Sequence, residues 1–531
     1  MSKQNEWQNA GIFTGAMLLF VLAAYISDCG YFWPSALLMC GIALLLYVLF
    51  YMHSRQVVNL GGLLSLFWLG GIGVAGFKLS ELSANHWSVT VWTCVLGFYI
   101  CYVLCYNGLG YFLKMRRMHS AAASADIADI KKHEPAEKMS NHSSKPTGAE
   151  PDTGKMRGED TRTLMALFIC ILTVTCISTL AFLIEAIVCG YVPALVINTP
   201  HAYSYFHVSG VHYFTVSAGF VHPLTLLYLY WKGFLEIQPL KNAVTCNRTE
   251  DSNRLKRLDV FKSTIRKLLC QIPWKKPITW ILIACNFLAI LIPVLCVSRY
   301  FLIMAFALTL VTFLAIRRWE SLKKTIAMTG ICLVILIPAY IVLTVLRGHD
   351  VAYLNEIFEM KNSQTPIFVT QPYMYIANNY ENFNALVNQL PEFVWGRRMI
   401  YPFFALTGLK FAYPDFLVGF IYYTKEELTT LTIIYDAYYD FGTVGVLVFG
   451  GALGLVSALV QERIRGNRNP IAYLLYAQLA MYMVLSFFTT WFSNPTTWFW
   501  LIATGMMYGF VEIIRRKGPG KSKMQGFRKG D

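Results

Sequence analysis

The chain has 531 residues, of which 56% are hydrophobic and only 14% are charged, and its formal net charge is +15. A mean hydropathy of +0.47 excludes an ordinary soluble globular protein and predicts an all-α polytopic integral membrane protein. The positive charge is explained by membrane orientation and contact with anionic lipid, so we expect no nucleic-acid partner.

Twelve apolar stretches of roughly 16 to 25 residues have the length that a helix needs to cross about 30 Å of hydrocarbon. The first is expected to stay as a span, because no convincing small-residue cleavage site follows it. The predicted spans are residues 11–26, 32–51, 60–77, 90–113, 164–188, 211–231, 277–297, 300–316, 325–346, 441–460, 471–488 and 498–514.

Lys and Arg residues are distributed unevenly between the two sides of these spans. With the N-terminus inside, 37 of the 45 Lys and Arg residues fall on the cytoplasmic side. Because Lys and Arg near the end of a span resist translocation, we expect twelve helices in the plasma (inner) membrane, with both termini cytoplasmic.

The spans group into four blocks. Residues 1–113 hold spans one to four, and residues 164–231 hold spans five and six. Residues 277–346 hold spans seven to nine, and residues 441–514 hold the last three. The blocks are separated by three longer links, and a tail follows the last of them.

The links and the tail differ in composition. Residues 114–163 are rich in Ser, Pro, Gly and charged residues, so we expect a disordered cytoplasmic linker. Residues 232–276 form a basic cytoplasmic loop, whose apolar period and cationic flanks predict a helix on the inner leaflet. Residues 515–531 form a basic cytoplasmic tail.

The third link, residues 347–440, is the predicted functional region. Its 94 residues include ten Asp or Glu, six Lys or Arg and 21 aromatic residues. Such a composition indicates a segment that binds a polar molecule at the membrane surface. We expect one large extracytoplasmic loop that contains short helices.

The loop begins with three groups suited to phosphate chemistry. Arg347 is followed closely by His349 and Asp350, which places a guanidinium, an imidazole and a carboxylate near the outer surface. Such a group could bind a phosphate and move a proton. Alternatively, Arg347 extends to the lipid headgroups while His349 and Asp350 cap the next segment.

Arg397 and Arg398 are adjacent cations on the expected outer side, against the usual inside preference. Arginine binds phosphate oxygens in bidentate fashion, and a pair can neutralise a diphosphate leaving group. The alternative is pairing with acids such as Glu381 or Glu392, or with anionic lipid. Arg299, between predicted spans seven and eight, is a third outer cation that faces either a polar cavity or the headgroups.

Aromatic and acidic residues complete the loop. Asp436 and Asp440 stand four residues apart and share one face if this stretch is helical. No cluster with metal-ligand spacing is visible, so neither a metal nor a cofactor is expected. Aromatic faces suit sugar rings, although they equally suit an interfacial belt. The candidate sugar contacts are Tyr375, Tyr380, Trp395 and Tyr401.

The chain resembles the bacterial oligosaccharide repeat-unit polymerases of the O-antigen polymerase type over most of its length. The resemblance rests on many spans with one large late outer loop, and on the three passages YIANNYENFNAL (375–386), GRRMIYPFFALTG (396–408) and YDAYYDFGTVGVLVFGGALG (435–454). Arg397 and Gly408 also match an Arg, ten residues, Gly pattern of such loops, which many chains match by accident.

The resemblance implies a glycosyltransferase that joins repeat units carried on undecaprenyl diphosphate or a similar polyprenyl diphosphate into a surface polysaccharide. It makes residues 347–440 the catalytic loop, with His349 or Asp350 as the base and Asp436 or Asp440 as second choices. The residues expected to hold the diphosphate are Arg299, Arg347, Arg397 and Arg398. The implied partners are the lipid-linked oligosaccharide, membrane lipids, a chain-length regulator and a flippase.

Two other functions stay open. A ligase that attaches finished glycan to another acceptor shares the donor, the loop and the arginines, so sequence alone does not separate it from a polymerase. A transporter shares the twelve spans. However, the clearest ionisable groups within the predicted spans are Glu185 and His222, and hydrogen bonds within the protein could satisfy both.

Overall fold

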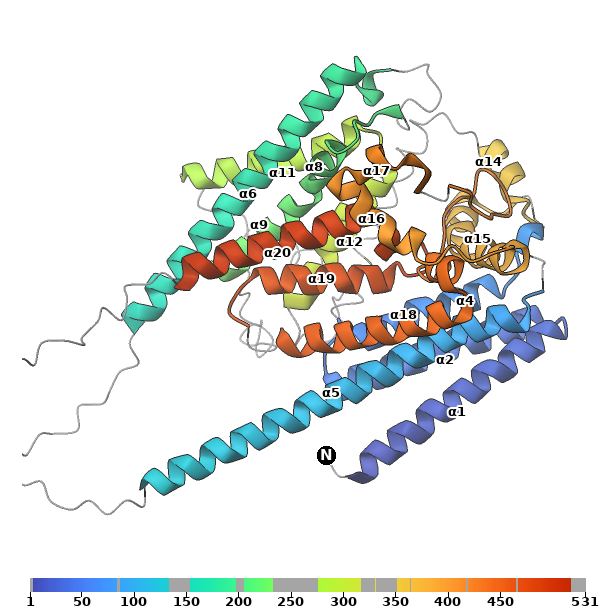
Figure 1. Cartoon of the computed structure of the whole chain (residues 1–531), viewed down its shortest axis with the longest axis horizontal. Coiled ribbons are helices and arrows are strands. Elements are labelled where there is room, and N and C mark those ends of the chain that lie inside the picture. Colours follow the sequence, from blue (N-terminus) through green and yellow to red (C-terminus); the bar gives the residue numbers. More distant parts are fainter. Residues whose placement is uncertain are drawn as a thin grey trace, which may run out of the picture. The chain divides into compact units, whose positions relative to one another are not determined.

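The computed structural model describes residues 3–83, 86–132, 153–196, 205–232, 276–316, 330, 351–362, 364–416, 419–464 and 467–516. These residues are mainly helical (Figure 1), and they contain no β-strand beyond one isolated antiparallel bridge between Ser80 and Met360. The prediction of an all-α protein is therefore confirmed. The chain divides into two compact units, which we describe in turn.

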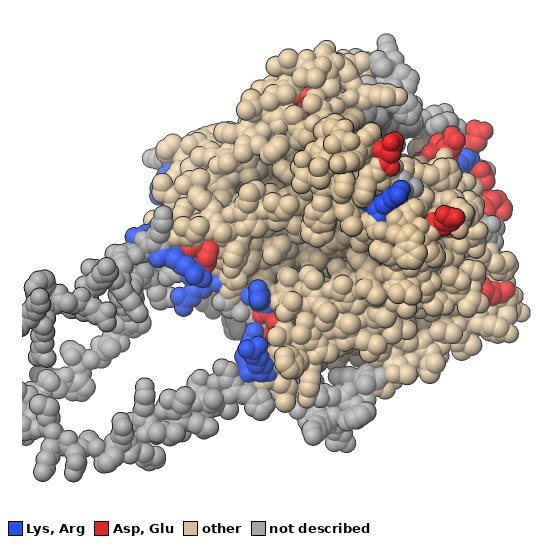
Figure 2. Space-filling view, viewed as in Figure 1, with Lys and Arg blue, Asp and Glu red and all other residues tan. Residues whose placement is uncertain are grey.

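Seven helices of the described ranges are long and apolar enough to cross a membrane, as expected for a multi-pass membrane protein. Each coincides with a predicted span, while the total of twelve stays a prediction. Figure 2 shows broad uncharged faces, with charged side chains largely confined to small groups. The seven apolar helices are Gly11–Asp28, Phe32–Ser54, Val89–Arg117, Thr161–Cys189, Pro277–Leu295, Tyr435–Arg463 and Pro495–Arg516.

Two of the other predicted spans are interrupted. Residues 60–77 form α3 (Leu60–Leu64), a π-helical turn (Ser65–Leu69) and α4 (Gly70–Ala75). Residues 211–231 form α8 (His212–Val216), a 3-10 turn (Ser217–Phe220) and α9 (Val221–Trp231). Glycines recur in the first run, and in the second Gly219 lies within the break and Pro223 follows it, as is common where helices bend.

The remaining predicted spans are short or undescribed. Residues 300–316 belong to α12 (Arg299–Ile316), and α19 (Ile471–Val484) ends before residue 488. Both are apolar, but each is shorter than the seven long spans. The predicted span at 325–346 lies outside the described residues, except for residue 330.

Unit 1 comprises Met1–Pro151, Leu314–Asn467 and Leu475–Ile502. Within it, α1 lies beside α2, and α5 lies beside α18 (Figure 1). Besides α3, α4 and most of α19, its helices are α1 (Lys3–Asp28), α2 (Phe32–Ser54), α5 (Val89–Lys132), α14 (Val351–Phe358), α15 (Ile367–Gln389), α16 (Arg397–Thr407), α17 (Leu409–Ala412), α18 (Tyr435–Arg463) and the beginning of α20 (Pro495–Arg516).

Two glycines allow α18 to approach α5 closely. A Cβ atom added at Gly450 would lie 2.5 Å from the carbonyl oxygen of Phe98, and one at Gly454 would lie 2.3 Å from that of Tyr102. Small residues four positions apart commonly bring membrane helices into backbone contact. The passage GGALG (450–454) within the resembling segment 435–454 thus has a structural explanation.

Replacing Gly454 with valine is expected to destabilise the protein by about 1–3 kcal/mol, because α18 must move away from α5 to make room. The melting temperature of the detergent-purified protein, followed by size-exclusion chromatography after heating, measures the effect. Gly505→Val on α20 is the matched control, since an added Cβ there meets nothing within 4 Å. Equal melting temperatures for the two variants would contradict the close approach.

The predicted disordered linker at 114–163 is partly helical. α5 continues to Lys132, and α6 (Thr153–Cys189) begins before the predicted linker ends. The run SAAASADIADIKK at 120–132 explains the extension, because alanine has the highest helix propensity. Residues 133–152 and the predicted surface helix within 233–275 lie outside the described part of the chain.

Unit 2 comprises Asp152–Phe313, Arg468–Leu474 and Ala503–Asp531. Its α6 contacts α8, α9 and α11 (Pro277–Leu295), and it also holds most of α12. The first turn of α19 and the last part of α20 belong to this unit. These two helices therefore divide between the units.

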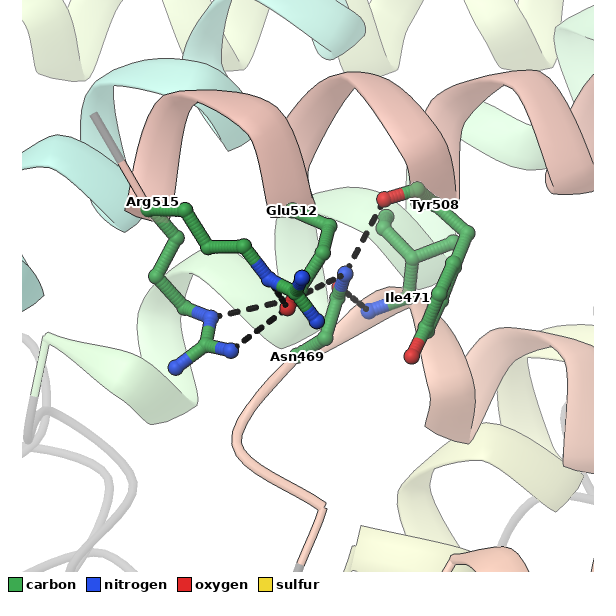
Figure 3. A network of polar contacts seen from close by, with 6 residues as sticks. Asn469, Ile471, Tyr508, Glu512 and Arg515 are labelled. Carbon is green, nitrogen blue, oxygen red and sulfur yellow. Dashed lines mark hydrogen bonds and ion pairs between the residues drawn. The ribbon is translucent and has the colours of Figure 1, made fainter.

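A polar network joins the start of α19 to the last turns of α20 in unit 2 (Figure 3). Asn469 is fully buried: its Oδ1 accepts a hydrogen bond of 3.0 Å from the first N–H of α19, and its Nδ2 donates one of 3.0 Å to the Tyr508 carbonyl. The Glu512 carboxylate accepts hydrogen bonds of 2.6 Å each from Arg515 and Arg516. The network fixes the last turns of α20 against the start of α19.

Candidate functional site

The candidate site in unit 1 begins with an acidic turn at the start of α18. This helix begins at Tyr435 rather than at residue 441, so Asp436 and Asp440 are both helical and share a face, as the sequence predicts. Gly442 then interrupts the helix with φ 62° and ψ −151°, a conformation essentially restricted to glycine. The kink separates the acidic turn from the apolar remainder of α18.

Asp440 fixes the N-terminus of α16. It is fully buried, and its two carboxylate oxygens accept hydrogen bonds from the backbone N–H groups of Arg398 at 3.1 Å and Met399 at 2.8 Å. These amides belong to the first helical turn after Gly396, where intrahelical partners are lacking. The positive end of the helix dipole also stabilises a carboxylate at this position. Asp440 is therefore a positioning group, and it occupies amides that would otherwise attract a phosphate.

Arg398 is held by Asp436. Its guanidinium forms an ion pair with the Asp436 carboxylate, and the side chains are only 10% and 3% exposed. The Tyr439 ring lies 4.7 Å from the guanidinium carbon, which adds a cation–π contact. Burial alone would lower the pKa of Arg398, but the charge of Asp436, the hydrogen bond to it and the neighbouring tyrosines together raise that pKa. The alternative of pairing with an acid thus holds for Arg398, although the partner is Asp436.

Arg397 is placed differently from its neighbour. Its side chain is exposed, and it makes no ion pair with any residue that the structure describes. Trp395, two positions earlier, is 75% exposed, with one ring edge against Phe441 at 6.3 Å between centroids. Arg397 is therefore a cation open to an outside ligand, next to an exposed aromatic face.

The other predicted sugar contacts are less open. Tyr380 is fully buried: its hydroxyl donates to the carbonyl of Trp68 at 2.9 Å, and its ring contacts those of Trp68 and Trp87. This burial argues against a sugar contact at Tyr380, because its ring face is used within the protein. Tyr375 and Tyr401 are partly exposed.

For four of the predicted site residues, the side chains lie outside the described part of the structure. Arg347, His349 and Asp350 lie outside the described residues. Arg299 is the first residue of α12 and belongs to unit 2, and its side chain also lies outside the described part. Their predicted roles in binding the diphosphate and in proton transfer stay predictions.

The asparagine-rich passage at 375–386 belongs to α15, and its side chains hold the nonhelical segment 424–430 against this helix. Asn382 accepts a hydrogen bond of 2.8 Å from the Thr424 N–H and donates one of 2.6 Å to the Leu428 carbonyl. Asn379 accepts a 2.5 Å hydrogen bond from the Thr430 hydroxyl. Both asparagines are fully buried, and the Asn382 amide replaces water for the backbone groups of Thr424 and Leu428.

A polar cavity of about 540 Å³ opens beside α15. It lies between that helix, residues 81, 82 and 86 of the link before α5, and residues 423–424. Sequence reasoning considered Glu381 only as an ion-pair partner and missed the cavity, since its walls come from three distant segments. The polar groups that line it include Glu81, His86, Glu381, Asn384, Asn388 and Tyr423.

The predicted intramembrane ionisable groups are satisfied within unit 2. Glu185 is fully buried and accepts hydrogen bonds from the Val208 N–H at 3.0 Å and the Thr215 hydroxyl at 2.7 Å. Its carboxylate also lies 3.0 Å from Nδ1 of His212. His222 contacts Asn286 at 2.8 Å. The structural explanation given for these groups is therefore the one that the contacts favour.

Comparison with known protein families, with characterised proteins and with solved structures gives no significant match for this chain.

Proposed function

We propose that the chain polymerises oligosaccharide repeat units carried on polyprenyl diphosphate, at the outer face of the membrane. The observation that carries the proposal is the arrangement at the start of α16. Arg397 is exposed there beside the exposed Trp395, while Arg398 and the first-turn amides are held by Asp436 and Asp440. A fixed helix thus presents one open cation and one aromatic face in a largely apolar protein.

The chemistry needs few groups. The hydroxyl oxygen of the acceptor forms a bond to the anomeric carbon of the donor sugar and gives its proton to a base, for which we propose His349 or Asp350. The bond from that carbon to the diphosphate breaks. The leaving polyprenyl diphosphate takes the electron pair, and a cation on its oxygens stabilises the developing charge. We assign this role to Arg397, with Arg347 as a further cation. Arg398 is a positioning residue.

The proposed topology places α16 on the outer side. It has twelve membrane helices in the plasma membrane, with both termini in the cytoplasm, and it rests on the strong bias of Lys and Arg toward one side. The ligase and the transporter are the alternatives. The hydrogen-bonded state of Glu185 and His222 gives no support to a proton-coupled transporter.

Deletion of the gene in its host tests the function. Extraction of the lipid-linked glycans and sizing by mass spectrometry should show single repeat units accumulating on polyprenyl diphosphate, with long chains restored by the wild-type copy. Long chains that form on the carrier but never reach their acceptor would instead indicate a ligase. An unchanged glycan profile would contradict both enzymes and favour the transporter.

A further inference from the structure

We infer that α16 and α17 lie in the surface of the membrane, with their exposed apolar side chains among the lipids of the outer leaflet. Both helices belong to the predicted outer loop at 347–440 rather than to a predicted span. α16 has 11 residues and α17 has 4, whereas a helix needs about 20 residues to cross the bilayer. They are therefore long enough to enter the membrane surface but too short to span it.

The exposed residues of α16 follow one face of the helix. Arg397, Ile400 and Phe403 are spaced by three residues, and all three are exposed. The opposite face packs within the protein, where Pro402 and Ala405 are buried. A helix at a water-facing surface normally has a polar exposed face. The exposed face of α16 is instead mainly apolar, with a cation at its beginning.

α17 extends this apolar surface beyond the end of α16. Gly408, with φ 79°, separates the two helices. Phe411 is 71% exposed, and its neighbours Leu409 and Tyr413 are exposed as well. Exposed apolar side chains that gather in one place mark an interaction surface. We use the term apolar cluster for Ile400, Phe403, Leu409, Phe411 and Tyr413.

Ring contacts connect the segment to membrane helices of unit 1. The Phe403 ring lies 4.8 Å from the Trp498 ring at the start of α20, between centroids. Trp395 contacts Phe441 of α18, one turn before the exposed Val444. Both helices are long and apolar enough to span the membrane, and exposed apolar side chains of such helices face lipid. The surface around α16 is therefore continuous with a surface that lipid covers.

The charges of the segment fit lipid headgroups. Between Phe393 and Pro414 the chain has Arg and Lys residues but no Asp or Glu. The flanking acids, Glu392 and Asp415, are exposed. In a helix that lies in the membrane surface, a cation such as Arg397 can reach the phosphates while its stem stays on apolar side chains. Anionic phospholipid is therefore the partner that fits both the apolar cluster and the charge beside it.

The inner side of α16 is fixed by the protein. The Asp440 carboxylate binds the first-turn amides of α16, as described above. In addition, the Ser493 hydroxyl donates a hydrogen bond of 3.2 Å to the Met399 sulfur. α16 also packs against α18. The outward direction of its apolar face is therefore a built feature of unit 1.

This position has a consequence for the proposed function, on which the consequence rests. A polyprenyl diphosphate keeps its chain in the hydrocarbon and its charged diphosphate among the headgroups. A helix in the membrane surface would hold Arg397 at the same depth. The lipid-linked substrate could then reach Arg397 by diffusing within the leaflet, without leaving the membrane.

Site-specific photo-cross-linking tests the position of α16 and α17. Phe403 or Phe411 of the full chain is replaced with p-benzoylphenylalanine, and the protein is irradiated in nanodiscs that contain equal parts of phosphatidylglycerol and phosphatidylcholine. Because both side chains are exposed, the larger ring should not disturb folding. Mass spectrometry should show lipid adducts at least about tenfold more abundant than at the control position, since the photoreactive ring would lie against acyl chains.

The matched control is Tyr423, an aromatic residue that lines the polar cavity beside α15. Tyr423→p-benzoylphenylalanine should give few lipid adducts, because that cavity is open to water rather than to acyl chains. Adducts at Phe403 and Phe411 that are no more abundant than at Tyr423 would overturn the inference. Cross-links from both positions to protein in place of lipid would overturn it as well.

The result is distinguishable from the test of the proposed function. Lipid adducts at Phe403 and Phe411, in a protein whose gene deletion leaves the host glycans unchanged, would refute the proposed function and leave the membrane position standing. Single repeat units that accumulate after deletion, together with no lipid adducts at either position, would refute the membrane position and leave the proposed function standing.

Discussion

Arg398→Ala should destabilise the protein by about 3–5 kcal/mol, the usual cost of removing one partner from a buried ion pair. The Asp436 carboxylate, 3% exposed, would lose its cation, and Tyr439 would lose its cation–π contact. Asp440 would still cap α16, because it binds the backbone of residue 398 rather than its side chain. The melting temperature in detergent and the yield of monodisperse protein measure the loss.

A second variant separates charge from shape in this pair. Replacing both partners, as in Arg398→Met with Asp436→Leu, leaves no uncompensated charge and should recover much of the stability lost in Arg398→Ala. The double variant also distinguishes a positioning role from direct substrate binding. Normal polymer yield from it would indicate positioning, whereas lost polymer from a stable double variant would indicate direct binding. If Arg398→Ala melts like the wild type, Arg398 is not the buried partner of Asp436.

The sequence predicts well whatever depends on local composition. Apolar length alone identified the seven long helices, and a spacing of four placed Asp436 and Asp440 on one face. It fails where partners are distant along the chain. Asp436 is 38 residues from Arg398, and Glu381 is 294 residues from Trp87, so no periodicity connects them.

The sequence also fails to distinguish adjacent residues of the same type. Arg397 and Arg398 are equivalent in sequence, but successive residues of a helix point about 100° apart, so one can be buried while its neighbour is exposed. The same limit applies to Tyr380, whose aromatic ring suits a sugar or a core equally well. Only its hydrogen bond to Trp68 and its full burial identify it as a core residue.

Arg397→Ala should have the opposite pattern to Arg398→Ala: loss of function without loss of stability. Arg397 is exposed and makes no ion pair with the described residues, so its truncation should change stability by no more than about 0.5 kcal/mol. If it stabilises the leaving diphosphate, polymer yield should fall about 10²–10³-fold, with single repeat units accumulating on the carrier. Mass spectrometry of lipid-linked glycans gives the yield.

The controls for Arg397 separate charge from geometry. Arg397→Lys keeps the charge but not the bidentate fork, so it should recover only part of the activity. Lys410→Ala removes another cation from the neighbouring α17 and should leave polymer yield unchanged if the effect is specific to Arg397. Normal polymer from a stable Arg397→Ala protein would remove the observation on which the proposed function rests. Loss of polymer in both alanine variants would point to the general positive charge of this surface, rather than to one guanidinium held at the start of α16.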